Sequence, residues 1–539
     1  MILELLPNLS PVASYFPAFP AFVRIVCSTI STTVYYSIFY FLLLFVIIIY
    51  IFCVLLQFYC TLYICTRAVR QIYIYITYNG TIHYIQHTIY ITAYILIYHC
   101  SIRRIFYSNI YIYIYFKMTT LLEEKLNTWF QPYHDGERVP CMSFSLVNKD
   151  KGEIYRKSFN TKFQTLVDHG KDETTFAIAS CTKVVTSVAA MQLLEKGIIN
   201  LDEPVSKYIK SFLDIPGVKE HAKDTTYTPL KRPITIRHIW THTAGLSYNI
   251  ISNLTNGKPN PLQQDYFKAM HTAKTLEEMV NNCARLPLVT QPGENWNYSI
   301  GIDVLGRIVE VVSGMTIDKY FEQYIFQPLG MNSTYFSQHV PDRHKNRQAS
   351  IYNCDIPTLM KDPKKFFLPD TTVNKMDIIS GDDDIFQAGA DTPLNPGGGL
   401  ISSMSDWSKF VQMFLNNGRS TNGTQIISPE SIDLMSKKST ETFYDDSTGP
   451  KMAYINGRNS SDQHYDQGLG IATGGNGKYK TFEWGGMTST VFWVDREKDL
   501  GCIAFTQLMP SAIWKIRDEL KDIVYDDAIL TNMHTIGKL

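Results

Sequence analysis

The chain has 539 residues, a length that allows about two to four domains. Its 50 Lys and Arg balance 50 Asp and Glu, so composition indicates neither a basic nucleic-acid-binding surface nor an acidic tail. Apolar residues make up 45% and charged residues 19%, which excludes a wholly disordered chain. Its 10 Cys show no close regular spacing, which excludes a disulfide scaffold.

The first 117 residues differ sharply from the rest of the chain. They carry only seven charged residues and 18 of the 34 Tyr, but none of the 7 Trp. Residues 118–539 hold the other 44 Lys and Arg and 49 Asp and Glu, a net charge of −5. Composition therefore divides the chain into a hydrophobic, Tyr- and Ile-rich segment and a mildly acidic domain.

Two interpretations of residues 1–117 stay open. The uncharged run from Tyr35 to Leu56 is long enough to span a bilayer, and the basic residues after it favour the cytoplasmic side. Alternatively, the segment is a misassigned start, because its Tyr-Ile alternation is what an in-frame TA-repeat DNA tract encodes. No Met lies between Met1 and Met118, where the composition changes at once to a helix-forming pattern.

Residues 118–539 show a mixture of helical and strand patterns. Helical spacing predicts helices over 121–129, 177–199, 302–313, 318–326, 405–416 and 512–528. Alternation and turn residues predict strands within 142–158, at 468–472, around 482, and at 490–494 and 501–506. Strands at both ends with helices between them predict an α+β domain whose two ends share one sheet.

The strongest chemical signal is Ser180 with Lys183 three positions later, in a predicted helix. Residues at i and i+3 lie on one helix face, so the two side chains are expected together. A serine hydroxyl is a weak nucleophile unless a base takes its proton, which a neighbouring Lys can do directly or by activating another base. Taken alone, the pair also fits a helix-capping Ser and a surface Lys.

A second element is Tyr298, in the loop before the predicted helix 302–313. A Tyr near an ammonium loses its proton more easily and can act as a general base. Taken alone, this Tyr also fits an ordinary packing residue.

A third element is the run Trp484, Gly485 and Gly486 at a strand edge. Paired glycines let a backbone approach a ligand closely, although they also fit a β-bulge. The next N–H, that of Met487, can join the N–H of Ser180 as an oxyanion hole.

Other chemistries find little support. His238 and His242 are four residues apart, but the Glu of a zinc-binding H-E-x-x-H motif is missing, so we expect no metal. No cofactor-binding motif is present either. The Cys of the body are scattered, and Cys181 is expected to point away from the Ser180 face into the core.

Together, the three elements resemble the penicillin-binding-like serine hydrolases, and residues of about 125–530 look like their class C β-lactamase-related family. Further sequence segments that match this family begin at Ile234, Phe326 and Pro396. The resemblance implies an antiparallel sheet flanked by helices plus a helical subdomain, with the site between them. It also implies that Ser180 is the acylated nucleophile and that Lys183 and Tyr298 are the pair that handles its proton. Trp484-Gly485-Gly486 is then the third motif, which binds substrate.

Two departures from the family pattern indicate the substrate class. Members that act on β-lactams or D-alanyl peptides usually have a Lys or His, which holds the substrate carboxylate, where Trp484 stands. They usually have an Asn where Ile300 stands. Both differences favour the esterase and acyltransferase branch.

We therefore expect a serine hydrolase that forms an acyl-enzyme with small acyl esters or thioesters, without a cofactor or nucleic-acid partner. Acyl transfer to an alcohol, a β-lactamase- or D-peptidase-type activity, and an idle binding module on the same fold are the alternatives. A glycosylation sequon starts at Asn297, and a glycan there would obstruct the site. This favours a cytoplasmic protein, or one anchored through residues 35–56 with the catalytic domain facing the cytosol. The sequence does not define an oligomeric state.

Overall fold

The computed structural model describes residues 118–135, 138–219, 226–248, 261–354, 376–378, 392–439, 465–474, 479–509 and 516–531. The chain divides into two compact units, Met1–Phe106 and Tyr107–Leu539, and every described residue belongs to the second. The candidate anchor from Tyr35 to Leu56 lies outside the described residues. Within the described ranges, no helix is both long and apolar enough to cross a bilayer.

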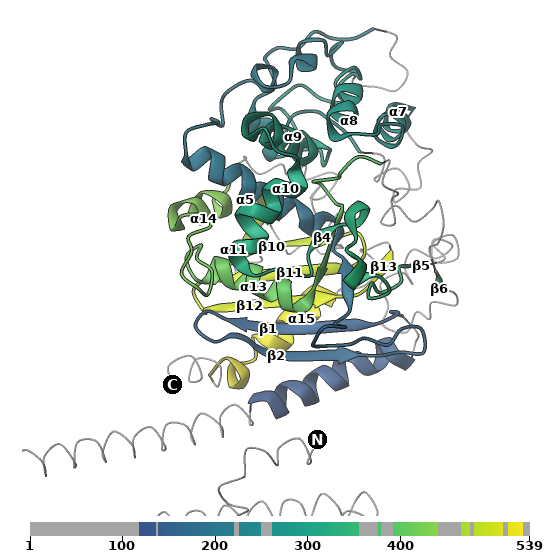
Figure 1. Ribbon diagram of the computed structural model, residues 1–539, viewed down its shortest axis with the longest axis vertical. Coiled ribbons are helices and arrows are strands. Elements are labelled where there is room, and N and C mark those ends of the chain that lie inside the picture. Colours follow the sequence, from purple (N-terminus) through teal and green to yellow (C-terminus); the bar gives the residue numbers. More distant parts are fainter. Residues whose placement is uncertain are drawn as a thin grey trace, which may run out of the picture. The chain divides into compact units, whose positions relative to one another are not determined.

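A seven-stranded antiparallel sheet forms the base of the second unit (Figure 1). In spatial order its strands are β2 (Gly152–Phe159), β1 (Met142–Asn148), β12 (Leu500–Phe505), β11 (Thr490–Asp495), β10 (Thr481–Gly486), β9 (Ala472–Gly474) and β8 (Tyr465–Gln467). Because β1 pairs with β12, the two ends of the domain share one sheet, which confirms the prediction.

Two three-stranded sheets and a set of helices complete the fold. The small sheets are β13 (Leu508–Met509), β5 (Tyr352–Cys354) and β6 (Met376–Ile378), and β3 (Thr175–Ala177), β7 (Leu400–Ser403) and β4 (Tyr335–Phe336). Besides helices over residues 118–135 and 527–531, the α-helices of the described residues are α5 (Thr182–Glu195), α6 (Ile236–Trp240), α7 (Pro261–His271), α8 (Leu276–Cys283), α9 (Gly301–Ser313), α10 (Ile317–Phe321), α11 (Gln327–Leu329), α13 (Met404–Leu415), α14 (Pro429–Ser436) and α15 (Ile516–Val524). Short 3-10 turns are η2 (Ala179–Cys181), η3 (Val205–Lys207), η4 (Lys210–Leu213), η6 (Ser337–His339) and η7 (Asp342–His344), and η5 (Glu322–Phe326) is a π-helix.

The main sheet has a separate hydrophobic core on each face. In β12, Cys502 and Ala504 belong to the core that includes α15 and a helix over residues 118–135, whereas Ile503 and Phe505 belong to the core that includes α5 and α13. This alternation is the two-residue period of a strand with both faces buried. Figure 1 shows α7, α8 and α9 gathered at the end of the unit away from the sheet, as expected for a helical subdomain.

The predicted elements are largely confirmed, with four corrections. In the predicted helix 512–528, residues 512–515 lie outside the described residues and α15 ends at Val524, before a turn at Tyr525. The predicted helix 177–199 is wrong at its start, because Ala177 pairs with Ile401 in β3 and the α-helix begins five residues later. The predicted strand 468–472 is mostly a turn, since Gly470 has a left-handed φ of 75°. The predicted helix 318–326 is divided into α10 and the π-helix η5.

Helix α5, which follows Ser180, is buried on nearly all sides. Its Ser187 Oγ accepts a hydrogen bond of 3.0 Å from Trp240 Nε1. The backbone of Gly470 passes so close to Ser187 that an added Cβ would lie 1.8 Å from Oγ. The turn at 468–471 therefore fixes α5 from the side of the sheet.

We predict that Gly470→Ala destabilises the domain more than Gly423→Ala. Both glycines have positive φ, which costs an Ala about 1–2 kcal/mol. Gly423 has open space where a Cβ would stand, so the clash with Ser187 adds about 1–3 kcal/mol at Gly470 alone. Urea unfolding of the two variants measures the difference. Equal losses would contradict the tight packing of Gly470 against α5.

Candidate active site

Ser180 lies in the short turn η2, between β3 and α5. The preceding residue, Ala179, has a left-handed φ of 45°, a conformation that a residue with a side chain adopts only at a cost. Two hydroxyls hold this turn. Thr488, in the turn after β10, donates its Oγ1 to Ala177 O at 2.7 Å, and Thr490, at the start of β11, donates its Oγ1 to Ile178 O at 3.0 Å. The surrounding structure thus fixes the strained backbone that presents Ser180.

Lys183 is nearly inaccessible to solvent, with 2% of its surface exposed. Its Nζ donates to Ser180 Oγ at 3.2 Å and to Gly397 O at 2.5 Å. The same ammonium lies over two aromatic rings, 4.8 Å from the centroid of Tyr298 and 5.2 Å from that of Tyr248. The expected proximity of Ser180 and Lys183 is therefore present, although a 3-10 turn rather than an α-helix holds the Ser.

Tyr298 occupies the loop before α9, and its hydroxyl donates to Ser180 Oγ at 2.8 Å. Its ring is buried among four others, with centroids 4.7–6.2 Å away, which are those of His242, Tyr248, Trp296 and Trp484. Ser180 Oγ thus has both Tyr298 and Lys183 as hydrogen-bond partners. This arrangement can carry a proton away from a serine hydroxyl and return it.

The third motif ends strand β10 beside the Ser180 turn. A Cβ on Gly486 would lie 2.4 Å from Ile178 O and 3.0 Å from Ala179 Cβ, so glycine permits this close approach. Trp484, two residues before Gly486, lies on the same face of β10 as Gly486 and is fully buried. Its ring lies nearly parallel to that of His242. Met487 follows in the turn after β10. The oxyanion hole assigned to the N–H groups of Ser180 and Met487 stays a prediction.

The Beta-lactamase family model matches residues 126–525. The chain belongs to the beta-lactamase family. Monacolin J acid methylbutanoyltransferase of Aspergillus terreus is 24% identical over 354 residues, which are 63% of this chain and 78% of that protein. Esterase EstB of Burkholderia gladioli is 27% identical over 212 residues, 38% of this chain and 50% of its own length. These findings confirm the resemblance that the motifs indicate.

The solved structures agree on the fold of this beta-lactamase-family domain. EstCE1, described as a hydrolase with promiscuous acyltransferase activity, superposes with a TM-score of 0.57 at 21% identity. The match covers 76% of this chain and 99% of EstCE1. The predicted α+β fold, an antiparallel sheet with helices, is thereby confirmed.

Three polar groups next to Lys183 were missed by the sequence reasoning. Asp303 Oδ2 accepts from the Tyr248 hydroxyl at 2.7 Å, and Asp303 Oδ1 accepts from the Gly397 N–H at 2.9 Å. Asp303 and Gly397 lie in segments that match the family, but nothing in the spacing assigned them to Lys183. No sequence signal singled out Tyr248.

His238 and His242, the two histidines four residues apart in the sequence, make hydrogen bonds in separate parts of the structure. His238 Nδ1 accepts from the Thr235 N–H in the capping box that starts α6. His242 Nδ1 accepts from the Ser299 N–H at 3.3 Å, so its other ring nitrogen carries the proton. Burial and the charge of Lys183 hold the pKa of His242 well below its usual value, which keeps the ring neutral. Among the described residues, no group of three or more His, Cys, Asp and Glu could hold a metal ion.

Cys181, the neighbour of Ser180, is fully buried, as expected. Burial raises the pKa of its thiol to about 12, so it is not an alternative nucleophile.

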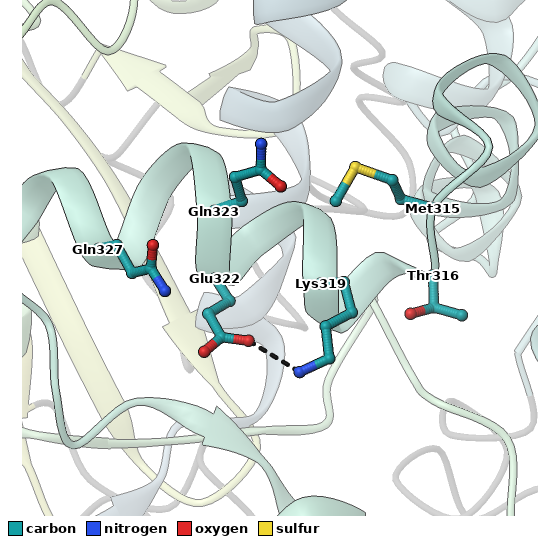
Figure 2. A pocket seen from close by; sticks show the side chains of 6 residues that line it. All are labelled: Met315, Thr316, Lys319, Glu322, Gln323 and Gln327. Carbon is teal, nitrogen blue, oxygen red and sulfur yellow. Dashed lines mark hydrogen bonds and ion pairs between the residues drawn. The ribbon is translucent and has the colours of Figure 1, made fainter.

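A surface pocket of about 490 Å³ lies over α10 and η5, where an ion pair of 2.9 Å joins Lys319 and Glu322 (Figure 2). Its lining includes none of the residues assigned to the Ser180 site.

We predict that Gly486→Ala slows acylation of Ser180 by roughly 10-fold or more, because small displacements at a reacting centre cost that much. The added methyl group would push the end of β10 away from the Ser180 turn. Gly485→Ala is the matched control, since its Cβ would meet no atom closer than 3.2 Å. The labelling rate with a fluorophosphonate measures the effect. Equal rates in both variants would contradict the close approach at Gly486.

Proposed function

We propose that this protein is a serine hydrolase that forms an acyl-enzyme on Ser180 and acts on small acyl esters or thioesters. The observation that supports this most strongly is the pair of contacts to Ser180 Oγ, at 2.8 Å from the Tyr298 hydroxyl and 3.2 Å from Lys183 Nζ. An ordinary helix-capping Ser has no need of a buried Lys and a buried Tyr on its hydroxyl. The same contacts weigh against an idle binding module.

The proposed reaction has two steps with one proton-handling unit. In the proposed reactive state Tyr298 is a phenolate beside the ammonium of Lys183. Ser180 Oγ attacks the carbonyl carbon of the ester while its proton passes to this phenolate. The pair returns this proton to the departing alcohol or thiol, which leaves the acyl group on Ser180. A water molecule then attacks the acyl-enzyme, and the pair accepts the proton of the water and returns it to Ser180 Oγ. In the proposed oxyanion hole, the N–H groups of Ser180 and Met487 stabilise the negatively charged oxygen that forms in each step.

The side chain of Trp484 supports the proposal that the substrate is uncharged. Its indole is buried against the rings of Tyr298 and His242, and an indole cannot pair with a substrate carboxylate. Paired glycines, here Gly485 and Gly486, let a ligand approach the backbone of a strand edge closely. We therefore place neutral acyl or alcohol groups beside this strand.

Acyl transfer to an alcohol is the second candidate. It uses the same acyl-enzyme, with an alcohol instead of water in the second step. The relative from Aspergillus terreus is named as a methylbutanoyltransferase, and EstCE1 is described as a hydrolase with acyltransferase activity. These names favour acyl transfer to an alcohol as an alternative reaction of the same Ser180 site.

We also propose that residues 118–539 form the catalytic domain and that it resides in the cytosol. The sequon residue Asn297 donates its side-chain amide to Leu246 O, and its N–H donates to His242 O at 2.7 Å. A glycan on this amide would break the first bond beside Tyr298. Attachment through residues 35–56, with the domain facing the cytosol, is the alternative for a membrane-bound form.

We predict that a p-nitrophenyl ester or a fluorophosphonate acylates or labels Ser180. Intact-protein mass spectrometry should show one adduct, and peptide mapping should place it on Ser180. Cys181→Ala, which removes the neighbouring thiol, should keep the adduct, whereas Ser180→Ala should lose it. An adduct that persists in Ser180→Ala would disprove the assignment, and no adduct in the unmodified protein would favour the binding module.

We predict efficient turnover of neutral short-chain esters and poor turnover of nitrocefin and benzylpenicillin. The ion pair that a Lys or His makes with a substrate carboxylate is worth about 1.5–3 kcal/mol, or about 10- to 150-fold in binding, and the neutral indole of Trp484 cannot form an ion pair. The measurement is kcat/KM for both substrate classes, with Ser180→Ala as the background. If β-lactam hydrolysis equals or exceeds ester hydrolysis, the esterase proposal is wrong.

A further inference from the structure

Asp303, in the first turn of α9, is a completely buried carboxylate at the edge of the site. Both of its oxygens are used: Oδ2 accepts from Tyr248 and Oδ1 accepts from the Gly397 N–H. A Cβ on Gly397 would lie 2.4 Å from Oδ2, so the chain approaches the carboxylate as closely as a glycine allows. A buried carboxylate is costly unless it is paired with a positive charge.

The two groups that contact Asp303 also contact Lys183. The Gly397 peptide gives its N–H to Asp303 and its carbonyl to Lys183 Nζ. The Tyr248 hydroxyl bonds to Asp303, while the Tyr248 ring lies 5.2 Å from Lys183 Nζ. One peptide and one ring therefore connect the carboxylate to the ammonium that bonds to Ser180.

Several titratable groups face Lys183 or Asp303 from the surrounding elements. They come from η2, the loop after α6, α8, the loop before α9, and α9 itself. These groups are Cys181, His242, Tyr248, Cys283, Tyr298 and Asp303. Burial keeps His242 neutral and raises the pKa of Cys181, Cys283 and Tyr248, so these four carry no charge near neutral pH. Burial also raises the pKa of Asp303, but Lys183, Tyr248 and the Gly397 N–H oppose this shift.

We propose that Asp303 is a positioning residue whose carboxylate is the counter-charge of Lys183 and which, through Gly397 and Tyr248, holds the ammonium beneath Ser180. Its effect on the reaction rests on the proposed acyl-enzyme function. The pairing itself is a property of the folded protein and can be tested without any turnover.

The test is a double-mutant cycle of thermal unfolding in the full-length chain, with Asp303→Asn, Lys183→Met and the double variant. Each single variant leaves one buried charge without its partner, and we expect each to lower Tm by roughly 5 °C or more. The double variant removes both charges, so its loss should be clearly smaller than the sum of the single losses. Additive losses of Tm would overturn the pairing.

Asp406→Asn is the matched control. Asp406 is also a buried aspartate that accepts backbone and side-chain hydrogen bonds, from the Ser333 N–H and from Thr334 Oγ1, but it does not share a contact with Lys183. Combined with Lys183→Met, it should give additive losses of Tm. Coupling as strong as that of Asp303 would show that the cycle does not report a specific pair.

The split between kcat and KM for an ester gives a second readout. If Asp303 holds the ammonium of Lys183 beneath Ser180, Asp303→Asn should lower kcat by roughly 10-fold or more and leave KM nearly unchanged, whereas Asp406→Asn should change neither. An unchanged kcat in a folded Asp303→Asn variant would overturn the positioning role. Activity that survives in Ser180→Ala would instead contradict the proposed function and leave the unfolding cycle as the test of the pair.

Discussion

The burial of the Lys183 ammonium is the constraint on which the site depends. A buried ammonium needs acceptors for its N–H groups, because losing water without replacement is costly. Ser180 Oγ and Gly397 O supply two, and the rings of Tyr298 and Tyr248 face the same charge. Four segments distant in sequence must therefore meet at one point, and the nucleophile lies where they meet.

The turn that carries Ser180 shows how the fold supports this arrangement. Ala179 has a left-handed φ, and such a backbone persists where neighbouring contacts leave it no alternative. The hydroxyls of Thr488 and Thr490 hold the two carbonyls before it, while Gly486 packs against the same residues. The third motif therefore has a structural task beside the substrate-binding role proposed for it.

The parts of the fold that follow from local patterns were predictable. The strands around the 148–152 turn and helix α9 follow from periodicity and turn residues. The pairing of the two ends of the domain follows from the α+β pattern of strands at both ends with helices between them. The start of the helix after Ser180 was wrong, because Ala177 is drawn into a strand by pairing with Ile401, which no local pattern reveals. For the same reason, the bonds of Asp303 to Tyr248 and Gly397 could not be predicted, since they join segments about 55 and 94 residues apart.

The most direct test of the account is a kinetic cycle on the two partners of Ser180. Lys183→Ala and Tyr298→Phe should each lower kcat for a p-nitrophenyl ester by roughly 10²-fold or more, the scale of general acid–base catalysis. Because the two side chains are taken to act as one proton-handling unit, the double variant should lose little beyond the worse single variant. Fully multiplicative losses, about 10⁴-fold in the double variant, would mean independent roles and would contradict a shared proton path through Ser180.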